Sequence, residues 1–598
     1  MLLSVTLTAG CANPQTQTQN GASQDARGST TAETAALVRK GVDRARGVSG
    51  AVVVTDPAKL VGEELPLYYL TADDERTIKL YFADEGHEIP YIDADTAALL
   101  LEDVYHDVNR DAGFDLTVAT KGHTTTLTRE NGYEMTIDAD KDSIYFTDLD
   151  AFFMPSDSPT VIDILEHYGL INCLERVEEA SYSRYGSDVA FELAPYGIDV
   201  IEKGGVCYLP LSTFTDICCA LTCYVFFLYN GQCVCANEYG LQEMEPSLLE
   251  KYYAVAPSDE PRSDALTHFS YQELCLALDY CYGLSEQHNI DGFDAFFIEC
   301  GLRDRLLDPD ALESTRALGD LVYVYLADGH CAFNGKSCRV GKDARIQATF
   351  GKDVIDRDLS YARYEAARTE FYPDGVLGYE EIGDIAYITF DTFDALPEGV
   401  DYYKDPPTAE AKDTVGICLY AFRQITREGS PVKNVVLDLS CNGGGDTTTA
   451  CFVLSLFLGE ARACVEDTLT GAYMNETFRC DANLDGTFDK ADSLEGYRLF
   501  CMTSPCSFSC GNLVPSVLKS SGKVKTIGAA SGGGSCIVMP IVTADGTRLQ
   551  ISSHRRMSHM VNGSVYDIDR GVVPDYPIAS LEHFYDRAAL TDYIDNLY

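Results

Sequence analysis

Basic side chains are scarce in this chain of 598 residues. It has 45 lysines and arginines against 93 aspartates and glutamates, which gives a formal net charge of −48. A surface of that sign repels polyanions and argues against nucleic acid as a partner. No apolar run approaches the roughly 20 residues of a membrane-spanning helix. We therefore expect a soluble body of several domains, because a chain of this length exceeds one hydrophobic core.

Paired cysteine patterns are also lacking, although the chain has 22 cysteines. Many lie inside apolar runs such as DICCALTCYVFFLYNGQCVCA at 216–236, where cysteine behaves as a small apolar side chain. The spacing of Cys233 and Cys235, and of Cys218 and Cys219, is not that of a zinc site. The sequence predicts no cysteine-bound metal and leaves the disulfide pairing open.

The first residues carry a targeting pattern. Residues 1–11, MLLSVTLTAGC, are a short apolar stretch that ends in small residues and Cys11. Residues 12–48 are rich in Gln, Thr, Ser and Gly, a composition that cannot bury enough surface to fold. The pattern resembles a bacterial lipoprotein signal, with Cys11 lipidated and a flexible tether behind it. It predicts an extracytoplasmic protein, either secreted or held at the bacterial membrane through Cys11; a disordered tail with an incidental cysteine is the alternative.

Four further regions differ in their hydrophobic pattern. Short alternating runs with Gly, Asn and Asp turns predict β-rich accessory segments at 49–155 and 156–260. Helical periodicity predicts a helical subdomain at 261–375, with His330 in a turn-rich loop. Strands alternate with helices at 376–598, which predicts an α/β core around a largely parallel, covered sheet.

Within this core, the polar loop SPCSFSCGN spans 504–512, between a predicted strand and a predicted helix. Such a loop lies at the carboxyl edge of a sheet, where ligands bind in open α/β folds. A serine there is well placed to act as a nucleophile. It could equally serve as the N-cap of the helix, a position that favours serine.

A glycine-rich loop follows another buried strand in VVLDLSCNGGGDTTT. Gly443, Gly444 and Gly445 place bare backbone N–H groups at a strand end near a helix start. Donors of this kind stabilise the oxyanion of an acyl-transfer reaction. A phosphate cradle is the alternative, but the Lys-Ser or Lys-Thr pair of a P-loop is missing.

Five motifs in order resemble the tail-specific (C-terminal processing) and tricorn-core serine proteases, over roughly residues 262 to 598. The resemblance implies a crotonase-like ββα core in which Ser509 is the nucleophile and the backbone N–H groups of Gly444 and Cys510 form the oxyanion hole. Ser440 replaces the usual arginine and Asn512 the usual glutamate. The motifs are IGDIAYITFDTF, VVLDLSCNGGG, MTSPCSFSCGN, TIGAASGGGS and DIDRGVVPDYPI.

The lysine that serves as general base in the tail-specific pattern is missing from this sequence. Those proteases use a lysine about 25 residues after the nucleophile, which falls near Gly534 here, and no lysine follows residue 525. The tricorn branch uses a histidine, and DGHCAF resembles the segment that bears it. The resemblance implies His330 as the base and Asp569 as the acid that orients it. Residues that remain as alternatives are Asp567 for the acid and His554 and His559 for the base.

The segment DANLDGTFDKAD at 481–492 resembles a calcium-binding loop. Oxygen-bearing side chains recur at alternate positions around Gly486, which suits a hard cation. An acidic surface turn is the alternative. The candidate ligands of a structural Ca²⁺ are Asp481, Asn483, Asp485, Asp489 and Asp492. No cofactor is expected to be required for catalysis.

The sequence thus predicts an exported serine endopeptidase that hydrolyses peptide or protein substrates through an acyl-enzyme. The alternative is an inactive peptide-binding receptor of the cell envelope with the same fold.

Overall fold

The computed structural model describes residues 46–51, 56–109, 111–156, 158–162, 171–238, 244–255, 261–397 and 399–597. The predicted lipoprotein signal with Cys11, and nearly all of the predicted tether, lie outside these residues. In the described part of the chain, no helix combines the length and the apolar composition needed to cross a membrane.

The α/β core is built around a six-stranded sheet. Its strands are, in spatial order, β16 (Tyr379–Ile382), β17 (Ile385–Thr389), β18 (Asn434–Asp438), β21 (Arg498–Thr503), β22 (Val524–Gly528) and β27 (Tyr576–Pro577). All neighbours from β17 to β27 pair in parallel, and β16 pairs antiparallel at the edge. The predicted largely parallel sheet is confirmed.

Helices cover both faces of this sheet, which explains why the central strands β17 and β18 are buried at every position. In β18, Val435 and Leu437 pack into one apolar cluster and Val436 packs into another on the opposite face. One face is covered by α11 (Thr414–Thr426), α12 (Thr447–Leu458) and α13 (Cys510–Ser520), and the other by α14 (Glu582–Tyr585) and α15 (Arg587–Asp595).

A second sheet joins the core to earlier parts of the chain. Strand β15 pairs antiparallel with β24, so the segment that follows His330 is anchored on the core. The strands of this sheet are β8 (Leu174–Arg176), β9 (Tyr182–Arg184), β15 (Ala332–Gly335), β19 (Ala461–Asp467), β20 (Tyr473–Cys480), β23 (Cys536–Val542) and β24 (Arg548–Ser558).

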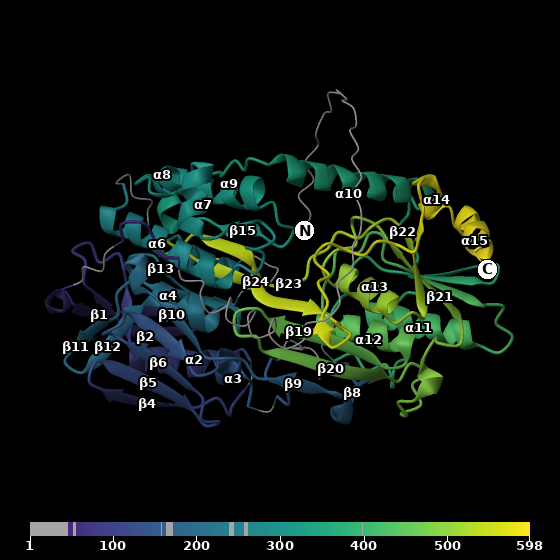
Figure 1. Ribbon diagram of the computed structural model, residues 1–598, viewed down its shortest axis with the longest axis horizontal. Helices are drawn as coiled ribbons and strands as arrows, with labels where there is room; N and C mark the ends of the chain where they lie inside the picture. The colour runs from purple at the N-terminus through teal and green to yellow at the C-terminus, as the bar shows by residue number, and fades with distance from the viewer. Residues whose placement is uncertain are drawn as a thin grey trace, which may run out of the picture.

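The β-rich N-terminal module contains two more sheets (Figure 1, purple to blue). The larger has the order β11 (Ile201–Lys203), β12 (Val206–Pro210), β3 (Tyr91–Asp93), β2 (Glu75–Phe82), β1 (Val61–Tyr69), β14 (Val234–Glu238) and β13 (Val225–Tyr229). The smaller has the order β10 (Val189–Glu192), β7 (Ser143–Phe146), β6 (Glu134–Asp138), β5 (Thr124–Arg129) and β4 (Leu116–Lys121). Both sheets pair strands from before and after residue 155, so the predicted division there does not separate them. The module's α-helices are α2 (Ala94–Asp107), α3 (Leu149–Phe153), α4 (Leu211–Phe214) and α5 (Pro246–Tyr252).

The predicted helical subdomain follows. It contains α6 (Asp264–Cys281), α7 (Phe293–Cys300), α8 (Arg303–Leu306) and α9 (Ala311–Asp320). Ser263 caps α6 by accepting a hydrogen bond from the backbone N–H of Leu266. The long α10 (Lys352–Phe371) then runs along the top of the molecule from these helices to α14 (Figure 1). The β-rich N-terminal part, the helical part and the α/β core expected from the sequence are therefore confirmed.

A buried charge network ties the N-terminal module to the second sheet. Asp467 at the end of β19 lies 2.9 Å from Nδ1 of His554, and Asp150 of α3 lies 2.8 Å from the Arg555 guanidinium. These four side chains are at most 7% exposed. Burial alone would raise the pKa of Asp467, but the His554 and Arg555 charges hold it well below its usual range.

Replacing Asp467 with Asn should lower the free energy of unfolding by about 3–5 kcal/mol, because the buried His554 ring and Arg555 guanidinium lose one carboxylate partner. Urea denaturation measures the change. The control is Asp356→Asn, which removes the exposed ion pair with Lys352 on α10 and should cost less than about 1 kcal/mol. Equal, small losses in the two variants would contradict this account.

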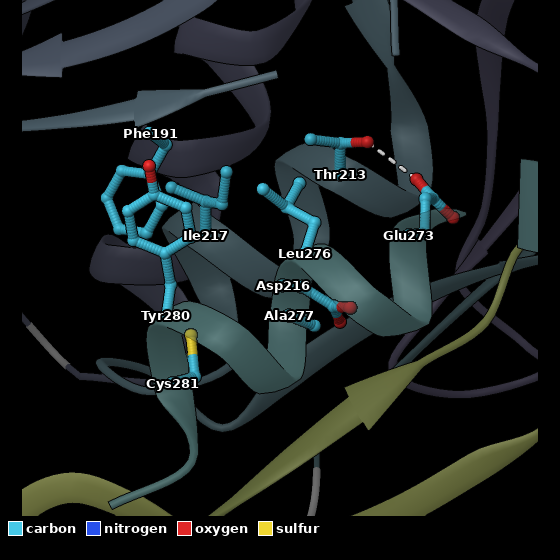
Figure 2. A pocket seen from close by; sticks show the side chains of 9 residues that line it. All are labelled: Phe191, Thr213, Asp216, Ile217, Glu273, Leu276, Ala277, Tyr280 and Cys281. Carbon is cyan, nitrogen blue, oxygen red and sulfur yellow. Dashed lines mark hydrogen bonds between the residues drawn. The ribbon is translucent and has the colours of Figure 1, made fainter. Parts of the chain in front are cut away.

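A small cavity lies where the N-terminal module meets α6 (Figure 2). Its volume of about 10 Å³ leaves room for about one water molecule, so it is not a peptide-binding pocket. Asp216 and Glu273 line it, and Glu273 accepts hydrogen bonds from Ser212 and Thr213 at 2.7 and 2.5 Å. Burial raises the pKa of Glu273 to about 7.

Because the pKa of Glu273 is higher in the folded state, its contribution to stability is present at low pH and is lost as pH rises from about 4.5 to about 7. Glu273→Gln keeps this side chain neutral. The variant should gain up to about 3 kcal/mol over the unmodified protein between pH 4 and pH 8. Urea denaturation at both pH values measures the difference, and a constant difference would contradict a raised pKa.

Candidate active site

Ser509 sits at the turn between β21 and α13 with φ 54° and ψ −124°. A residue with a β-carbon avoids this positive φ, and holding one there costs about 1–3 kcal/mol. The Ser509 side chain is partly exposed and makes no cap hydrogen bond with α13. The helix-cap interpretation is therefore not supported at this residue.

The other two serines of the loop have structural roles. Ser504 and Ser507 are fully buried. The Ser507 hydroxyl donates to the carbonyl oxygen of Leu439 at 2.7 Å, and that of Ser504 donates to the carbonyl oxygen of Ser440. Of the loop's three serines, Ser509 alone combines an exposed side chain with a strained backbone.

The glycine-rich loop packs directly against Ser509. Gly444 has φ +108°, and a β-carbon there would lie 2.6 Å from Cβ of Ser509 and 3.1 Å from its Oγ. The backbone N–H of Phe508 donates to the carbonyl oxygen of Asn442 at 3.0 Å. Only glycine satisfies both the space and the backbone conformation at position 444.

The two predicted oxyanion donors are not equivalent. The N–H of Cys510 is the first of α13, so the helix offers it no acceptor and its positive end favours an anion. The N–H of Gly444 already donates to Oδ1 of Asn442 at 2.9 Å. An oxyanion would have to share that donor with the Asn442 amide or displace the amide.

His330 reaches this region because β15, just after it, pairs with β24. Its backbone N–H donates to Oδ1 of Asp328 at 2.9 Å, and its carbonyl oxygen accepts from the Gln550 amide. Its ring lies 4.6 Å, centroid to centroid, from the ring of Phe508, the residue before Ser509. The structure thus brings the His330 loop and the Ser509 loop together across almost 180 residues of chain.

Gly534, where the tail-specific pattern would have its lysine, lies beside the rings of Phe508 and His330. A β-carbon at Gly534 would be 2.6 Å from the Phe508 ring and 3.1 Å from Cε1 of His330. The neighbouring carbonyl oxygen of Gly533 accepts from the N–H of Ser509 at 3.0 Å. The imidazole and the phenyl ring occupy the space that a side chain at position 534 would need.

Two carboxylates affect the pKa of the His330 imidazole. Burial lowers the pKa of His330, while Asp328 and then Asp569 oppose that shift. Asp569 accepts hydrogen bonds from the N–H and hydroxyl of Ser535 at 3.0 and 3.1 Å. Asp567 accepts from the N–H of Asp569 and so stabilises the turn. Asp328 was not among the predicted site residues, although it stands two positions before His330.

The two substitutions in the motifs have structural explanations. Asn512 is buried, donates to the carbonyl oxygen of Ile568 at 2.9 Å and accepts from Ser531 at 2.7 Å, which fixes α13 to the loop of Asp569. Beside Ser440, the strand-end carboxylate of Asp438 pairs with Arg587 of α15 at 2.9 Å. A guanidinium therefore reaches this strand end from another part of the chain.

The alternative bases lie in other surroundings. His554 belongs to the buried charge network described above. His559 packs against Tyr566, and burial lowers its pKa to about 4. The ring of His330 packs against Phe508, the residue before Ser509, so the geometry favours His330.

The acidic loop at 481–492 forms a tight turn. Asp481 accepts from the N–H of Gly486 at 2.7 Å and from the Tyr403 hydroxyl at 2.8 Å. Asp492 accepts from the N–H groups of Asn483 and Asp489 at 3.0 and 2.9 Å. The described residues contain no group of three or more His, Cys, Asp or Glu side chains arranged for a metal ion, so the calcium site stays a prediction from the sequence.

Several solved structures are similar to this chain. The photosystem II D1 C-terminal processing protease is 18% identical with a TM-score of 0.25, over 34% of this chain and 47% of that chain. A lipoprotein from Streptococcus agalactiae is 16% identical with a TM-score of 0.32, over 57% of this chain and 99% of that chain. The tricorn protease is 16% identical with a TM-score of 0.23, over 43% of this chain and 21% of that chain. The chain thus spans about half the length of the D1 processing protease.

A comparison with curated proteins finds no match. Residues 384–578, which run from just before β17 to just after β27, match the family model of peptidase family S41. The resemblance predicted from the five motifs is confirmed over these residues, which match the model of a peptidase family.

Proposed function

We propose that the protein is a serine peptidase in which Ser509 attacks the peptide carbonyl and His330 is the general base. The observation that carries the proposal is the position of Ser509, partly exposed, strained and packed against Gly444. A peptidase family implies peptide or protein substrates. The proximity of His330 to Phe508 supports the assignment of the base.

The proposed reaction follows the general scheme of serine hydrolases. His330 takes the proton of the Ser509 hydroxyl as Oγ bonds to the carbonyl carbon. The N–H groups of Cys510 and Gly444 receive the negative oxygen. The C–N bond then breaks, and the imidazolium gives its proton to the leaving amine. Water, deprotonated by His330, hydrolyses the acyl-enzyme and restores the Ser509 hydroxyl.

Asp569 and Asp328 would stabilise the imidazolium that forms in each half of this cycle. Both raise the pKa of His330 against the effect of burial. We assign the orienting role to Asp569, because Asp328 Oδ1 already accepts the backbone N–H of His330 and its Oδ2 accepts from the Tyr282 hydroxyl at 3.3 Å.

An inactive peptide-binding receptor is a second candidate, and one observation favours it. The N–H of Gly444 donates to Asn442, so one oxyanion donor is engaged within the protein. Export, the lipid anchor at Cys11 and the calcium ion are likewise proposals that come from the sequence alone.

A fluorophosphonate probe should label Ser509, and mass spectrometry of the digested protein should locate the adduct there. His330→Ala should slow labelling at least about 100-fold, because a general base contributes that much or more to proton transfer. His268→Ala is the control, since His268 is exposed on α6. No adduct on the folded protein would favour the receptor, and equal rates in both variants would exclude His330 as the base.

The labelling rate should depend on pH through His330. The imidazole must be neutral to accept a proton, and burial lowers its pKa from the ordinary value near 6.5. The rate should therefore stay high on acidification until the pH passes below 6.5. Labelling reactions quenched after fixed times at pH values from 4 to 8 measure the profile, with the His268→Ala variant as control. A midpoint above pH 6.5 would contradict a buried imidazole base.

A further inference from the structure

Two cysteines occupy the two loops that form the proposed site. Cys441 follows β18 in the glycine-rich loop, and Cys506 lies three residues before Ser509 in the loop after β21. Strands β18 and β21 are parallel neighbours with Asp438 opposite Met502. Both loops therefore leave the same edge of the sheet side by side.

Hydrogen bonds connect these two loops on both sides of the cysteines. The Ser507 hydroxyl donates to the carbonyl oxygen of Leu439 at 2.7 Å, and the N–H of Phe508 donates to that of Asn442 at 3.0 Å. The Ser504 hydroxyl reaches the carbonyl oxygen of Ser440. These hydrogen bonds thus hold the loop of Cys441 against the loop of Cys506.

The Cys441 and Cys506 thiols lie close enough for each to shift the pKa of the other. Cys441 is partly exposed and its Sγ also lies 3.3 Å from the Tyr585 hydroxyl, whereas Cys506 is 7% exposed. Both are free thiols. A small oxidant can therefore reach the pair from the side of Cys441.

The surroundings of Cys506 lower the pKa of its thiol. The Cys441 thiol lowers the pKa of Cys506, and Arg368 of α10 lowers it further against burial and the Glu365 charge. Arg368 is held in place by two hydrogen bonds to Asp391, at 2.5 and 2.7 Å. By contrast, burial raises the pKa of the neighbouring Cys510 to about 12.

We propose that Cys441 and Cys506 are a redox-sensitive dithiol whose disulfide links the glycine-rich loop to the nucleophile loop. The oxidant is a hydroperoxide such as hydrogen peroxide. The Cys506 thiolate attacks one peroxide oxygen, which breaks the O–O bond and leaves a sulfenic acid and hydroxide. The Cys441 sulfur then attacks the Cys506 sulfur, and the sulfenic oxygen leaves as water with the Cys441 proton.

The disulfide should slow the reaction at Ser509. A disulfide brings its sulfurs to about 2.05 Å, closer than two unbonded thiols, so the loops must move toward each other. Gly444 of one loop packs tightly against Ser509 of the other, and a displacement of about 1 Å can cost on the order of 100-fold in rate. This consequence rests on the proposed peptidase function, whereas the dithiol itself does not.

The test uses the full chain, reduced and then treated with hydrogen peroxide. Mass spectrometry of a non-reduced digest should show a peptide pair joined through Cys441 and Cys506, which dithiothreitol separates. In Cys441→Ser, dimedone should trap a sulfenic acid on Cys506. In Cys506→Ser, Cys441 should gain no dimedone adduct, because it lacks the lowered pKa.

Fluorophosphonate labelling measures the consequence. Peroxide should slow the labelling of Ser509 at least tenfold, and dithiothreitol should restore the labelling rate. In Cys441→Ser and in Cys506→Ser, which cannot form the disulfide, this reversible loss of labelling rate should be absent. The double variant Cys233→Ser/Cys235→Ser is the matched control, because those thiols also shift each other's pKa but lie at the start of β14. It should keep the slowing and its reversal.

Absence of the joined peptides after peroxide treatment would overturn the dithiol. The joined peptides without slower labelling would overturn its effect on the site. Failure of the proposed function is distinguishable, since a protein that is never labelled at Ser509 could still form the Cys441–Cys506 disulfide.

Discussion

The antiparallel pairing of β15 with β24 is the constraint on which the candidate site depends. This pairing places Ala332 opposite Gln550 and so holds the loop of His330 on the second sheet. Without that pairing the chain would have a strained serine and a glycine-rich loop but no imidazole beside them. The N-terminal module contributes to the same arrangement, because the buried network of Asp150, Asp467 and Arg555 joins it to β24.

Local sequence patterns predicted the α/β core well, because its strands and loops are indicated by residues that are adjacent in the sequence. Apolar runs such as NVVLD and RLFCMT became β18 and β21, and the polar loops that follow lie at one edge of a parallel sheet, as strand–helix alternation requires. The glycines at 444 and 445 have positive φ, which their place after a buried strand suggested. Asn230 and Gly231, a pair typical of hairpin turns, lie between β13 and β14, which pair antiparallel.

Long-range features could not be predicted, because no local pattern encodes them. The two predicted β-rich segments interleave through strands far apart in sequence, such as β1 and β14. Asn442 was part of a recognised motif, yet its hydrogen bond to the Gly444 N–H depends on one side-chain rotamer. Phe508 looked like an ordinary apolar residue, although its ring packs against both Gly534 and His330. The acidic loop shows the opposite case, in which a strong local pattern folds into a turn whose carboxylates accept backbone N–H groups.

The most direct test of the site is a crystal structure of the fluorophosphonate adduct. The account predicts phosphorus bonded to Oγ of Ser509, a ring nitrogen of His330 within about 2.6–3.2 Å of that oxygen, and the phosphonyl oxygen about 2.7–3.1 Å from the N–H of Cys510. An adduct in which the imidazole is turned away, with another basic side chain in its place, would contradict the account.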